Sequence, residues 1–246
     1  MVALIDPRGR RHLVTLSGGS EVAGRLGVID TAQLVGQAEG TTLRVGSVAL
    51  TAVRPTHLDL VAAMERRSQI VLPRDAALIA LAADVKSGDL VVEAGAGSGA
   101  LSLYLLRLVR PGGRLVSYEV REDHAAIARA NVERAGFSQW HTLRVADVRA
   151  GIKERGVDAV VLDMGEPWEA VGVAAAALRP GGRLVSYSPN IGQVERTHAA
   201  LRESRLSEAR TLETLERELV VGPQGTRPSF EMLGHTGYIT SARKIG

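Results

Sequence analysis

The sequence predicts an α/β protein in which a small β domain precedes a doubly wound, mostly parallel sheet. Three observations support this prediction. From Leu90 onward, short apolar runs of strand length alternate with segments of helical period, which is typical of parallel strands joined by crossover helices. A glycine-rich stretch stands where the first of these strands meets the first helix. Residues 1–58 contain only short apolar alternations separated by glycines.

The chain is expected to divide into a β domain over residues 1–58 and an α/β domain over residues 59–246. The first segment holds six arginines against four acidic residues, a mild surplus that favours contact with a polyanion. Thr56 at its end is placed to cap a following helix. In this part of the chain we expect strands over 12–16, 27–29, 42–45 and 48–50, helices over 59–64 and 76–83, a strand-like segment over 70–72, and breaks at Gly18, Gly19, Gly24, Gly36, Gly40 and Gly46.

The larger domain is expected to contain seven strands. Its last two apolar segments, 205–221 and 236–243, have no helix between them, so one of them should run antiparallel to its neighbours. The other expected strands cover residues 90–93, 114–120, 141–145, 157–162 and 183–187, and the expected helices cover 100–109, 124–135, 169–178 and 191–203.

Three glycines at every second position follow the first strand of this domain. Glycine permits positive φ and close backbone approach to a ligand, and the first N–H groups of the next helix point toward that ligand, so a nucleotide-like cofactor is expected. The spacing also fits a dinucleotide fingerprint, or a turn that only packs helix against strand. Glu93 before the turn and the early third glycine favour cationic S-adenosylmethionine. The expected cofactor residues here are Glu93, Gly95, Gly97, Ser98, Gly99, Ala100 and Leu101.

Composition argues against several classes of protein. The chain has no cysteine, and its six histidines lack the spacing of metal ligands, so neither disulfides nor a metal site is expected. No apolar run approaches the roughly 20 residues of a membrane span, and no signal peptide is recognisable, so a cytoplasmic protein is expected. All but three of the 30 basic residues are arginine, which favours a nucleic-acid partner, although a GC-rich genome produces the same bias.

Three acidic residues stand at or just past strand ends, where open α/β sheets bind their ligands. Glu119 is expected to accept both hydroxyls of a ribose, or else to pair with Arg121. Asp147 suits the amino group of an adenine, or else caps a helix. Asp163 is expected to meet the methionyl ammonium or a substrate nitrogen, unless it merely ends its strand.

Substrate contacts are expected farther along the chain. Pro167 and Trp168 would form a rigid, flat wall beside Asp163, although the tryptophan could instead pack against the core. Asn190 follows the fifth strand in a similar place. His235 lies in a Gly-His-Thr-Gly segment that is equally compatible with substrate contact and with a simple turn into the last strand.

Taken together, these segments resemble the tRNA adenine-N1 methyltransferase family that modifies position 58 of the T-loop. The resemblance spans essentially the whole chain, and its most specific segments are Arg66-Arg67-Ser68-Gln69, Glu122-Asp123-His124 and Gly234-His235-Thr236-Gly237. It implies the seven-stranded, Rossmann-like sheet of class I S-adenosylmethionine-dependent methyltransferases. It also implies S-adenosylmethionine as the methyl donor, tRNA as the substrate and a homotetramer.

The resemblance further implies roles for individual residues. Gln69, Glu119, His124 and Asp147 would hold the cofactor, and Asp163 would lie between the methyl donor and the adenine as the catalytic residue. Substrate contacts would come from Pro167, Trp168, Asn190 and His235. The chain departs from the family pattern at Leu72, where many relatives have tyrosine, and at Met164-Gly165-Glu166, which replaces the commoner Leu-Pro-Asp.

The chemistry expected from this resemblance requires no covalent intermediate. Adenine N1 has an in-plane lone pair that can attack a sulfonium methyl directly, so catalysis would depend on alignment and electrostatics. Unstacking the base would cost a few kcal/mol. Four other functions remain compatible with the sequence: methylation of adenines 57 and 58 together, methylation of a small molecule, RNA binding by a catalytically silent methyltransferase fold, and a nicotinamide-dependent activity.

Overall fold

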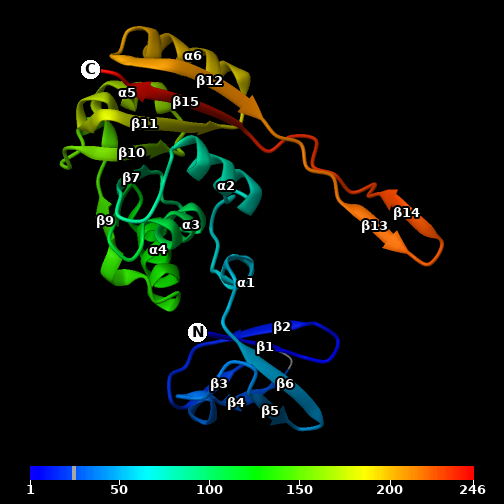
Figure 1. Ribbon diagram of the computed structural model, residues 1–246. Coiled ribbons are helices and arrows are strands. Elements are labelled where there is room, and N and C mark those ends of the chain that lie inside the picture. The colour runs from blue at the N-terminus through cyan, green and yellow to red at the C-terminus, as the bar shows by residue number, and fades with distance from the viewer. Residues whose placement is uncertain (24–25) are drawn as a thin grey trace.

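The computed structural model describes residues 1–23 and 26–246, so the expected break at Gly24 lies outside the described residues. Figure 1 shows a small sheet at the N-terminal end, a large sheet flanked by helices, and helix α1 between the two. A two-stranded arm projects from the large sheet. Among the described residues, no helix is long and apolar enough to cross a membrane.

The small sheet is antiparallel throughout and has the strand order β2-β1-β6-β5. Leu4, Val14 and Leu50 pack in its core with Ile29 from a separate two-stranded ladder. The sequence did not predict the first strand, which is short and pairs with the next strand in the chain on one side and with the distant sixth strand on the other. The strands are β1 (Val2–Ile5), β2 (Arg11–Val14), β3 (Ser20–Val22), β4 (Val28–Asp30), β5 (Thr42–Val45) and β6 (Val48–Val53).

Two helices join the small sheet to the large one. In α1 (His57–Ala63), the Thr56 side chain caps the helix through a capping box with Asp59, as predicted. The Asp59 carboxylate also accepts a hydrogen bond from Arg11 of β2 at 3.0 Å, which ties α1 to the small sheet. Helix α2 (Pro73–Ala82) begins three residues earlier than expected because proline is well suited to the first helical position. The strand-like segment expected at residues 70–72 is not a strand.

The large sheet has seven strands in the order β12-β15-β11-β10-β7-β8-β9. Its only antiparallel member is β15, which opposes both β11 and β12, so the predicted mixed sheet is confirmed. The chain runs outward from β7 through β8 to β9 and then returns to β10, which makes the carboxyl ends of β7 and β10 a topological switch point. The strands are β7 (Leu90–Ala94), β8 (Arg114–Glu119), β9 (His141–Val145), β10 (Val157–Leu162), β11 (Leu178–Ser188), β12 (Leu206–Glu213) and β15 (Tyr238–Lys244).

Helices cover both faces of the large sheet and bury two apolar cores. Side chains of α2 and α3 pack on one face with Val91 and Leu115, and side chains of α5 and α6 pack on the other with Val92 and Val160. The helices of this part are α3 (Ala100–Val109), α4 (Glu122–Arg134), α5 (Pro167–Ala177) and α6 (Ile191–Arg202).

The predicted long strand over residues 205–221 is wrong. Strand β12 ends at Glu213, and residues Leu219–Gly222 form a separate strand, β13, which pairs with β14 (Gly225–Pro228) in the projecting arm. No glycine or proline separates the two parts, so the sequence of residues 205–221 does not reveal that β12 pairs with β15 while β13 pairs with β14.

Candidate active site

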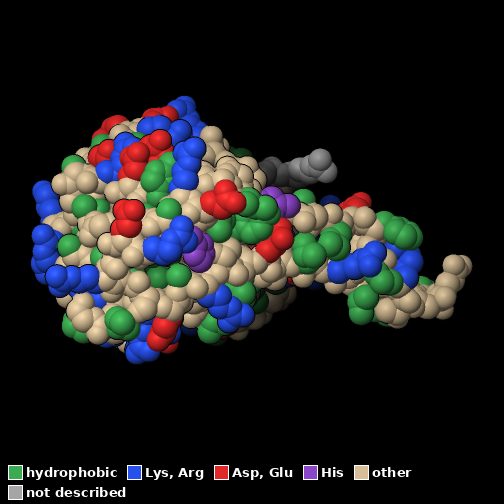
Figure 2. Space-filling view, turned by 90° about the horizontal axis from the view of Figure 1, so that it is seen from above, with side chains coloured by type: hydrophobic (Ala, Val, Ile, Leu, Met, Phe, Trp, Pro, Cys, Tyr) green, Lys and Arg blue, Asp and Glu red, His purple; other side chains and the backbone are tan. Residues whose placement is uncertain are grey.

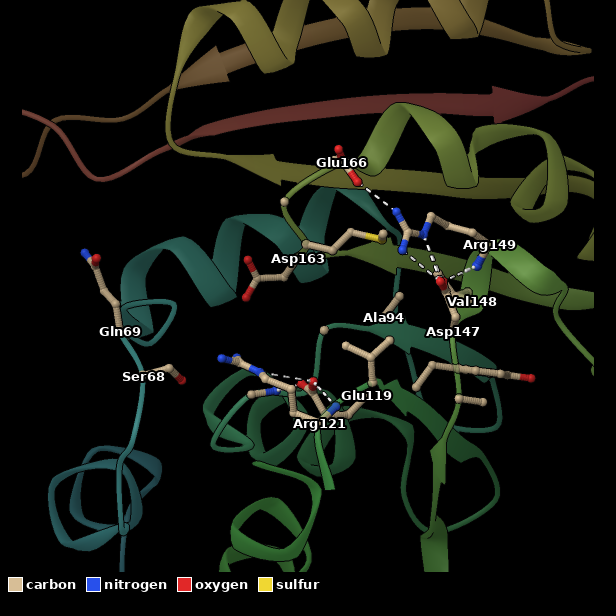
Figure 3. Close-up of a pocket in the computed structure, with 17 residues that line it drawn as sticks. Ser68, Gln69, Ala94, Glu119, Arg121, Asp147, Val148, Arg149, Asp163 and Glu166 are labelled. Carbon is tan, nitrogen blue, oxygen red and sulfur yellow. Dashed lines mark hydrogen bonds and ion pairs between the residues drawn. The ribbon is translucent and has the colours of Figure 1, made fainter. Parts of the chain in front are cut away.

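A cavity of about 480 Å³ lies at the carboxyl ends of β7, β8, β9 and β10, beside the switch point. Figure 3 shows Glu119, Asp147 and Asp163 around this cavity, with Ser68 and Gln69 at one side. The volume is within the range of small-molecule sites, and a lining with four carboxylates against two arginines suits a ligand with positive charge.

The glycine turn brings the ends of β7 and β10 into contact. Gly95 has φ +86°, and a Cβ atom there would lie 1.8 Å from the carbonyl oxygen of Asp163. Gly97 also has positive φ and lines the cavity. Gly99 serves packing, since a Cβ there would lie 3.3 Å from Ala128 Cα. Gly95 and Gly97 therefore form part of the cavity wall, where side chains would fill the space.

Glu119 is buried at the end of β8 and anchored by the backbone. Its Oε2 atom accepts a hydrogen bond from Gly97 N at 2.9 Å, and its Oε1 atom accepts one from Arg121 N at 3.0 Å. The Arg121 side chain is more distant, with 3.8 Å between Nε and Oε1. Each carboxylate oxygen keeps a lone pair for a further donor, so the side chain can accept two ligand hydroxyls.

Asp147 lies on the opposite wall and is held by Arg149. Its carboxylate accepts from Arg149 N at 2.9 Å and from the guanidinium at 2.8 to 3.0 Å. These hydrogen bonds lower the pKa of Asp147, so it is ionised at neutral pH. The cap that the sequence left open as an alternative is present, because Asp147 caps a short 3-10 helix while it also lines the cavity.

Asp163 follows β10, and its pKa departs further from the ordinary value than that of any other acid in the cavity lining. Its backbone N–H donates to Ala94 O at 2.8 Å, which fixes the start of the loop. Burial raises the pKa of Asp163 to about 7, and the nearby carboxylates of Glu93 and Glu119 contribute in the same direction. A cationic ligand in the cavity would offset this repulsion and favour the ionised form.

Glu93 does not line the cavity, although it lies close enough to influence Asp163. It is fully buried and accepts hydrogen bonds from Ser102 Oγ at 2.6 Å and Ser117 Oγ at 2.5 Å. Its Oε1 atom has no partner among the described residues. Burial raises the pKa of Glu93 to about 7 despite the two serine hydrogen bonds.

Gly99 and four further residues of the expected cofactor set lie outside the cavity lining, whereas Gln69 lies within it. Ser98 is buried, and its hydroxyl accepts a hydrogen bond from Arg67 N at 3.1 Å. His124 is also buried, and its Nδ1 atom lies 2.8 Å from Arg121 Nη2. Ala100 and Leu101 pack in separate apolar clusters. These four side chains therefore support the cavity wall from behind.

The residues expected to contact substrate are not brought together. Pro167 is the buried first residue of α5, and Trp168 packs beneath Arg196, whose guanidinium lies 5.0 Å from the ring centre. Asn190 caps α6 by accepting from Gln193 N at 3.0 Å. None of these three lines the cavity, because each is engaged in starting or packing a helix.

His235 lines a second cavity of about 270 Å³ that adjoins the first and shares Ser68 and Gln69 with it. The two ring nitrogens of His235 each lie 2.7 Å from an acceptor, Glu213 Oε1 and Pro189 O. These acceptors raise the pKa of His235 and favour its doubly protonated form.

The sequence did not identify Tyr187, which also lines the second cavity. Its hydroxyl donates to Asp75 Oδ2 at 3.0 Å, and its ring lies against Gly237, where a Cβ would be 2.4 Å away. The near-identical segments 109–118 and 178–187 could have pointed to Tyr187. Both segments end in a tyrosine, and the tyrosine of the first segment, Tyr118, lines the first cavity.

Replacing Asp163 by asparagine is expected to stabilise the cofactor-free protein at pH 8 more than at pH 5. The raised pKa means that the folded carboxyl retains its proton when the unfolded one has lost it. Its stabilising contribution is complete below the unfolded value of about 3.8 and is lost as the pH rises through about 7. The gain should be at most about 4 kcal/mol, measured by urea unfolding. Glu133→Gln on the exposed face of α4 is the control, and an equal gain at both pH values would contradict the expectation.

Comparisons with known proteins identify the family of this chain. Residues 52–225 match the family described as tRNA methyltransferase complex GCD14 subunit, and residues 1–43 match the TrmI-like N-terminal family. The chain is 36% identical to the tRNA (adenine(57)-N(1)/adenine(58)-N(1))-methyltransferase TrmI of Methanocaldococcus jannaschii, over 98% of this chain and 93% of that protein. It is 34% identical to the tRNA (adenine(58)-N(1))-methyltransferase TrmI of Thermus thermophilus, over 98% and 95%.

A solved structure shares the whole architecture. It is that of an S-adenosylmethionine-dependent O-methyltransferase from Thermotoga maritima, with a TM-score of 0.85, 32% identity, and coverage of 100% of this chain and 92% of that one. The predicted class I S-adenosylmethionine-dependent methyltransferase fold is therefore confirmed. With a family match over most of its length and two close relatives over nearly all of it, the chain belongs to the TrmI/GCD14 family of tRNA methyltransferases.

Proposed function

We propose that this protein is a cytoplasmic enzyme that transfers a methyl group from S-adenosylmethionine to N1 of adenine 58 in the T-loop of tRNA. The observation that carries the proposal is the convergence of Glu119, Asp147 and Asp163 on one cavity that opens beside a second cavity. One cavity would hold the methyl donor and the other the target base. The named activity of the Thermus relative supports the choice of position 58.

The first cavity fits S-adenosylmethionine group by group. Glu119 would accept the two ribose hydroxyls, since both its oxygens have a free lone pair. Asp147 would accept from the adenine amino group at the far wall. Gly95 and Gly97 leave room for close approach of the ligand, and Gln69 would close the side nearest the second cavity. When bound, the cofactor supplies a methyl group on a positively charged sulfur.

The second cavity fits a purine taken out of its stack. Tyr187 offers an aromatic face, and Leu72 and Leu233 add apolar walls. Leu72 gives the base an apolar contact where many relatives offer a second aromatic ring. The His235 imidazolium would attract the tRNA backbone at the cavity edge, because a cation there favours a phosphate.

Asp163 would align the base and stabilise the charge that forms on it. Its carboxylate would accept a hydrogen bond from the exocyclic amine, which directs the N1 lone pair toward the methyl group. As N1 forms its new bond, positive charge spreads over the adenine ring, and a carboxylate held in a low-dielectric cavity stabilises it. The carbon–sulfur bond breaks in the same step, and its electron pair remains on sulfur.

The defining experiment is methylation of an unmodified transcript of tRNA with isotopically labelled S-adenosylmethionine, followed by mapping of reverse-transcription stops. A stop at position 58 is expected, and a transcript with guanine at position 58 should remain unlabelled. A second stop at position 57 would assign the dual specificity named for the Methanocaldococcus relative.

A second candidate function is methylation of an oxygen atom on a small molecule, because the Thermotoga neighbour is named as an O-methyltransferase. Labelled donor incubated with a metabolite extract would distinguish the two functions. Label in small molecules with none in tRNA would overturn the proposal. Absence of S-adenosylmethionine binding by calorimetry would exclude both functions.

We further propose that residues 1–58 are a tRNA-binding appendage on a catalytic domain over residues 59–246. The appendage carries six basic against four acidic residues, most of the net charge of +3, and is joined to the catalytic domain through α1 and the Arg11–Asp59 ion pair. Its position at one end of the molecule would extend the contact with tRNA beyond the target base (Figure 1).

We also propose that the chain assembles into a homotetramer in which projecting arms pair. Figure 2 shows hydrophobic side chains along the arm as it leaves the body of the molecule. Val221 and Phe230 are 78% and 84% exposed, and an isolated two-stranded hairpin is at best marginally stable in water. Opposite charges would meet when two arms pair antiparallel, because each arm has glutamates at its base and Arg227 in β14. The glutamates are Glu216, Glu218 and Glu231.

Replacing Val221 by aspartate is therefore expected to reduce the mass of the particle to that of a dimer or monomer. A charge on the apolar arm would have to be buried without a partner in the assembled form. Light scattering after size exclusion measures the change, with Ile245→Asp, an exposed apolar residue at the other end of the sheet, as the matched control. A wild-type monomer, or an unchanged oligomer in the Val221 variant, would contradict this mode of assembly.

A further inference from the structure

Arg149 joins the two walls of the first cavity. The Nε and Nη2 atoms of its guanidinium bind the carboxylate of Asp147, at 3.0 and 2.8 Å. The Nη1 atom binds Glu166 Oε2 at 2.7 Å and Glu169 Oε2 at 2.9 Å. Figure 3 shows this guanidinium between Glu166 and Asp147 at the end of the cavity away from Gln69.

The two walls joined by Arg149 carry different parts of the reaction. Asp147 stands after β9, where the adenine of the cofactor would bind, whereas Glu166 stands three residues after Asp163 in the loop between β10 and α5. Asp147, Arg149 and Glu166 all line the cavity, so the bridge is part of the cavity wall. The upstream end of the loop is already fixed by the hydrogen bond from Asp163 N to Ala94 O. Arg149 holds the downstream end through Glu166, and Gln193 Nε2 donates to Gly165 O in the same loop at 2.7 Å.

We infer that Arg149 is a positioning residue that orients Asp147 toward the adenine of the cofactor and holds the Asp163 loop in its reactive position. The inference rests on the proposed function of this cavity. Glu166 itself is exposed, and the apolar packing of Val148 against α5 joins the two walls only beneath the bridge. Without the guanidinium, the carboxylates of Asp147, Glu166 and Glu169 would repel one another, so Asp147 and the loop that follows Asp163 would lose their fixed orientation. Cofactor affinity and turnover would then fall together, for separate reasons.

The test compares Arg149→Met with Arg155→Met, a matched change of an exposed arginine on the same connection. Arg155 donates only to the backbone carbonyls of Ile152 and Glu154. For Arg149→Met we expect S-adenosylhomocysteine to bind about tenfold more weakly by calorimetry, because a network of three ion pairs at one guanidinium exceeds a single exposed pair. The kcat at saturating donor should also fall by about tenfold. Arg155→Met should remain within about twofold of the wild type in both.

Double variants separate positioning from a general effect on structure. If Arg149 acts on affinity through Asp147, Asp147→Asn with Arg149→Met should bind S-adenosylhomocysteine no more weakly than Asp147→Asn alone. If it acts on turnover through Asp163, adding Arg149→Met to Asp163→Asn should leave kcat unchanged. Arg149→Lys should recover part of both losses, because lysine keeps the charge but not the forked geometry.

Fully additive losses in both double variants, or unchanged affinity and turnover in Arg149→Met, would overturn the inference. A lowered thermal midpoint in Arg149→Met with wild-type kinetics below that midpoint would also overturn it and indicate a purely structural role. The binding measurements use S-adenosylhomocysteine alone. They therefore test the effect of Arg149 on cofactor affinity even if tRNA proves not to be the substrate.

Discussion

Replacing Asp163 by alanine is expected to lower kcat by about a hundredfold or more while S-adenosylmethionine affinity changes by less than about tenfold. The two effects differ because Asp163 is proposed to act on the base in the second cavity, whereas Glu119 and Asp147 hold the cofactor through other contacts. Single-turnover methylation of a tRNA transcript, together with calorimetry of S-adenosylhomocysteine, measures the two quantities separately. Near-normal turnover would remove Asp163 from the mechanism.

The pH dependence provides the control for this prediction. With a pKa of about 7, the carboxylate that accepts from the exocyclic amine forms as the pH rises through neutrality. The wild-type rate should therefore increase with pH around 7, and bound donor, being cationic, should move this rise to lower pH. Asp163→Asn should lose the rise, because an amide does not titrate. If the rate of Asp163→Asn still rose with pH around 7, the ionisation would belong to another group.

Much of the catalytic sheet could be predicted from the sequence because its signals are local. The strand over residues 157–162 and the helix over 100–109 have the predicted bounds, since each is an unbroken apolar run or a clear helical period between turn residues. The convergence of Glu119, Asp147 and Asp163 followed from the parallel arrangement, which places all the strand ends at one edge of the sheet. That the three acids share one cavity depends also on the strand order β10-β7-β8-β9, which local signals do not specify.

The parts that the sequence did not reveal depend on partners far away in the chain. Tyr187 lines the second cavity because Gly237 and Asp75, which are distant in sequence, pack against its ring and hydroxyl. Trp168, expected as a substrate wall, turns instead toward Arg196 of the next helix. Propensity and alternation describe neighbours along the chain, so neither pattern specifies these contacts.

The placement of Glu93 illustrates how one strand pattern allows two functional interpretations. Successive side chains of a strand point to opposite faces of the sheet. A carboxylate near the end of β7 could therefore face either the ligand or the protein interior, depending on a shift of one residue. In the structure Glu93 faces α3 and β8, where it accepts hydrogen bonds from two serines. It influences Asp163 in the cavity through its charge. After the burial of Asp163 itself, the charge of Glu93 contributes to the raised pKa of Asp163, and a cationic donor would offset that repulsion.

Replacing Gly95 by alanine is expected to cost about 3 kcal/mol or more of stability and to abolish measurable cofactor binding. The new Cβ would overlap the carbonyl oxygen of Asp163, and φ +86° disfavours any side chain, so β7 and β10 would have to separate at the switch point. Such a loss corresponds to a fall in thermal midpoint of roughly 10 °C in a chain of this size.

Two matched glycines show why the effect should be specific to Gly95. A Cβ at Gly165, in the same cavity lining, or at Gly172, inside α5, would meet no atom within 4 Å, and neither residue has positive φ. Gly172→Ala should be neutral or stabilising by up to about 1 kcal/mol, as is usual within a helix. Gly165→Ala should keep most of the cofactor affinity. If Gly95→Ala bound S-adenosylhomocysteine as these controls do, the close approach of the two strand ends would not be what shapes the cofactor site.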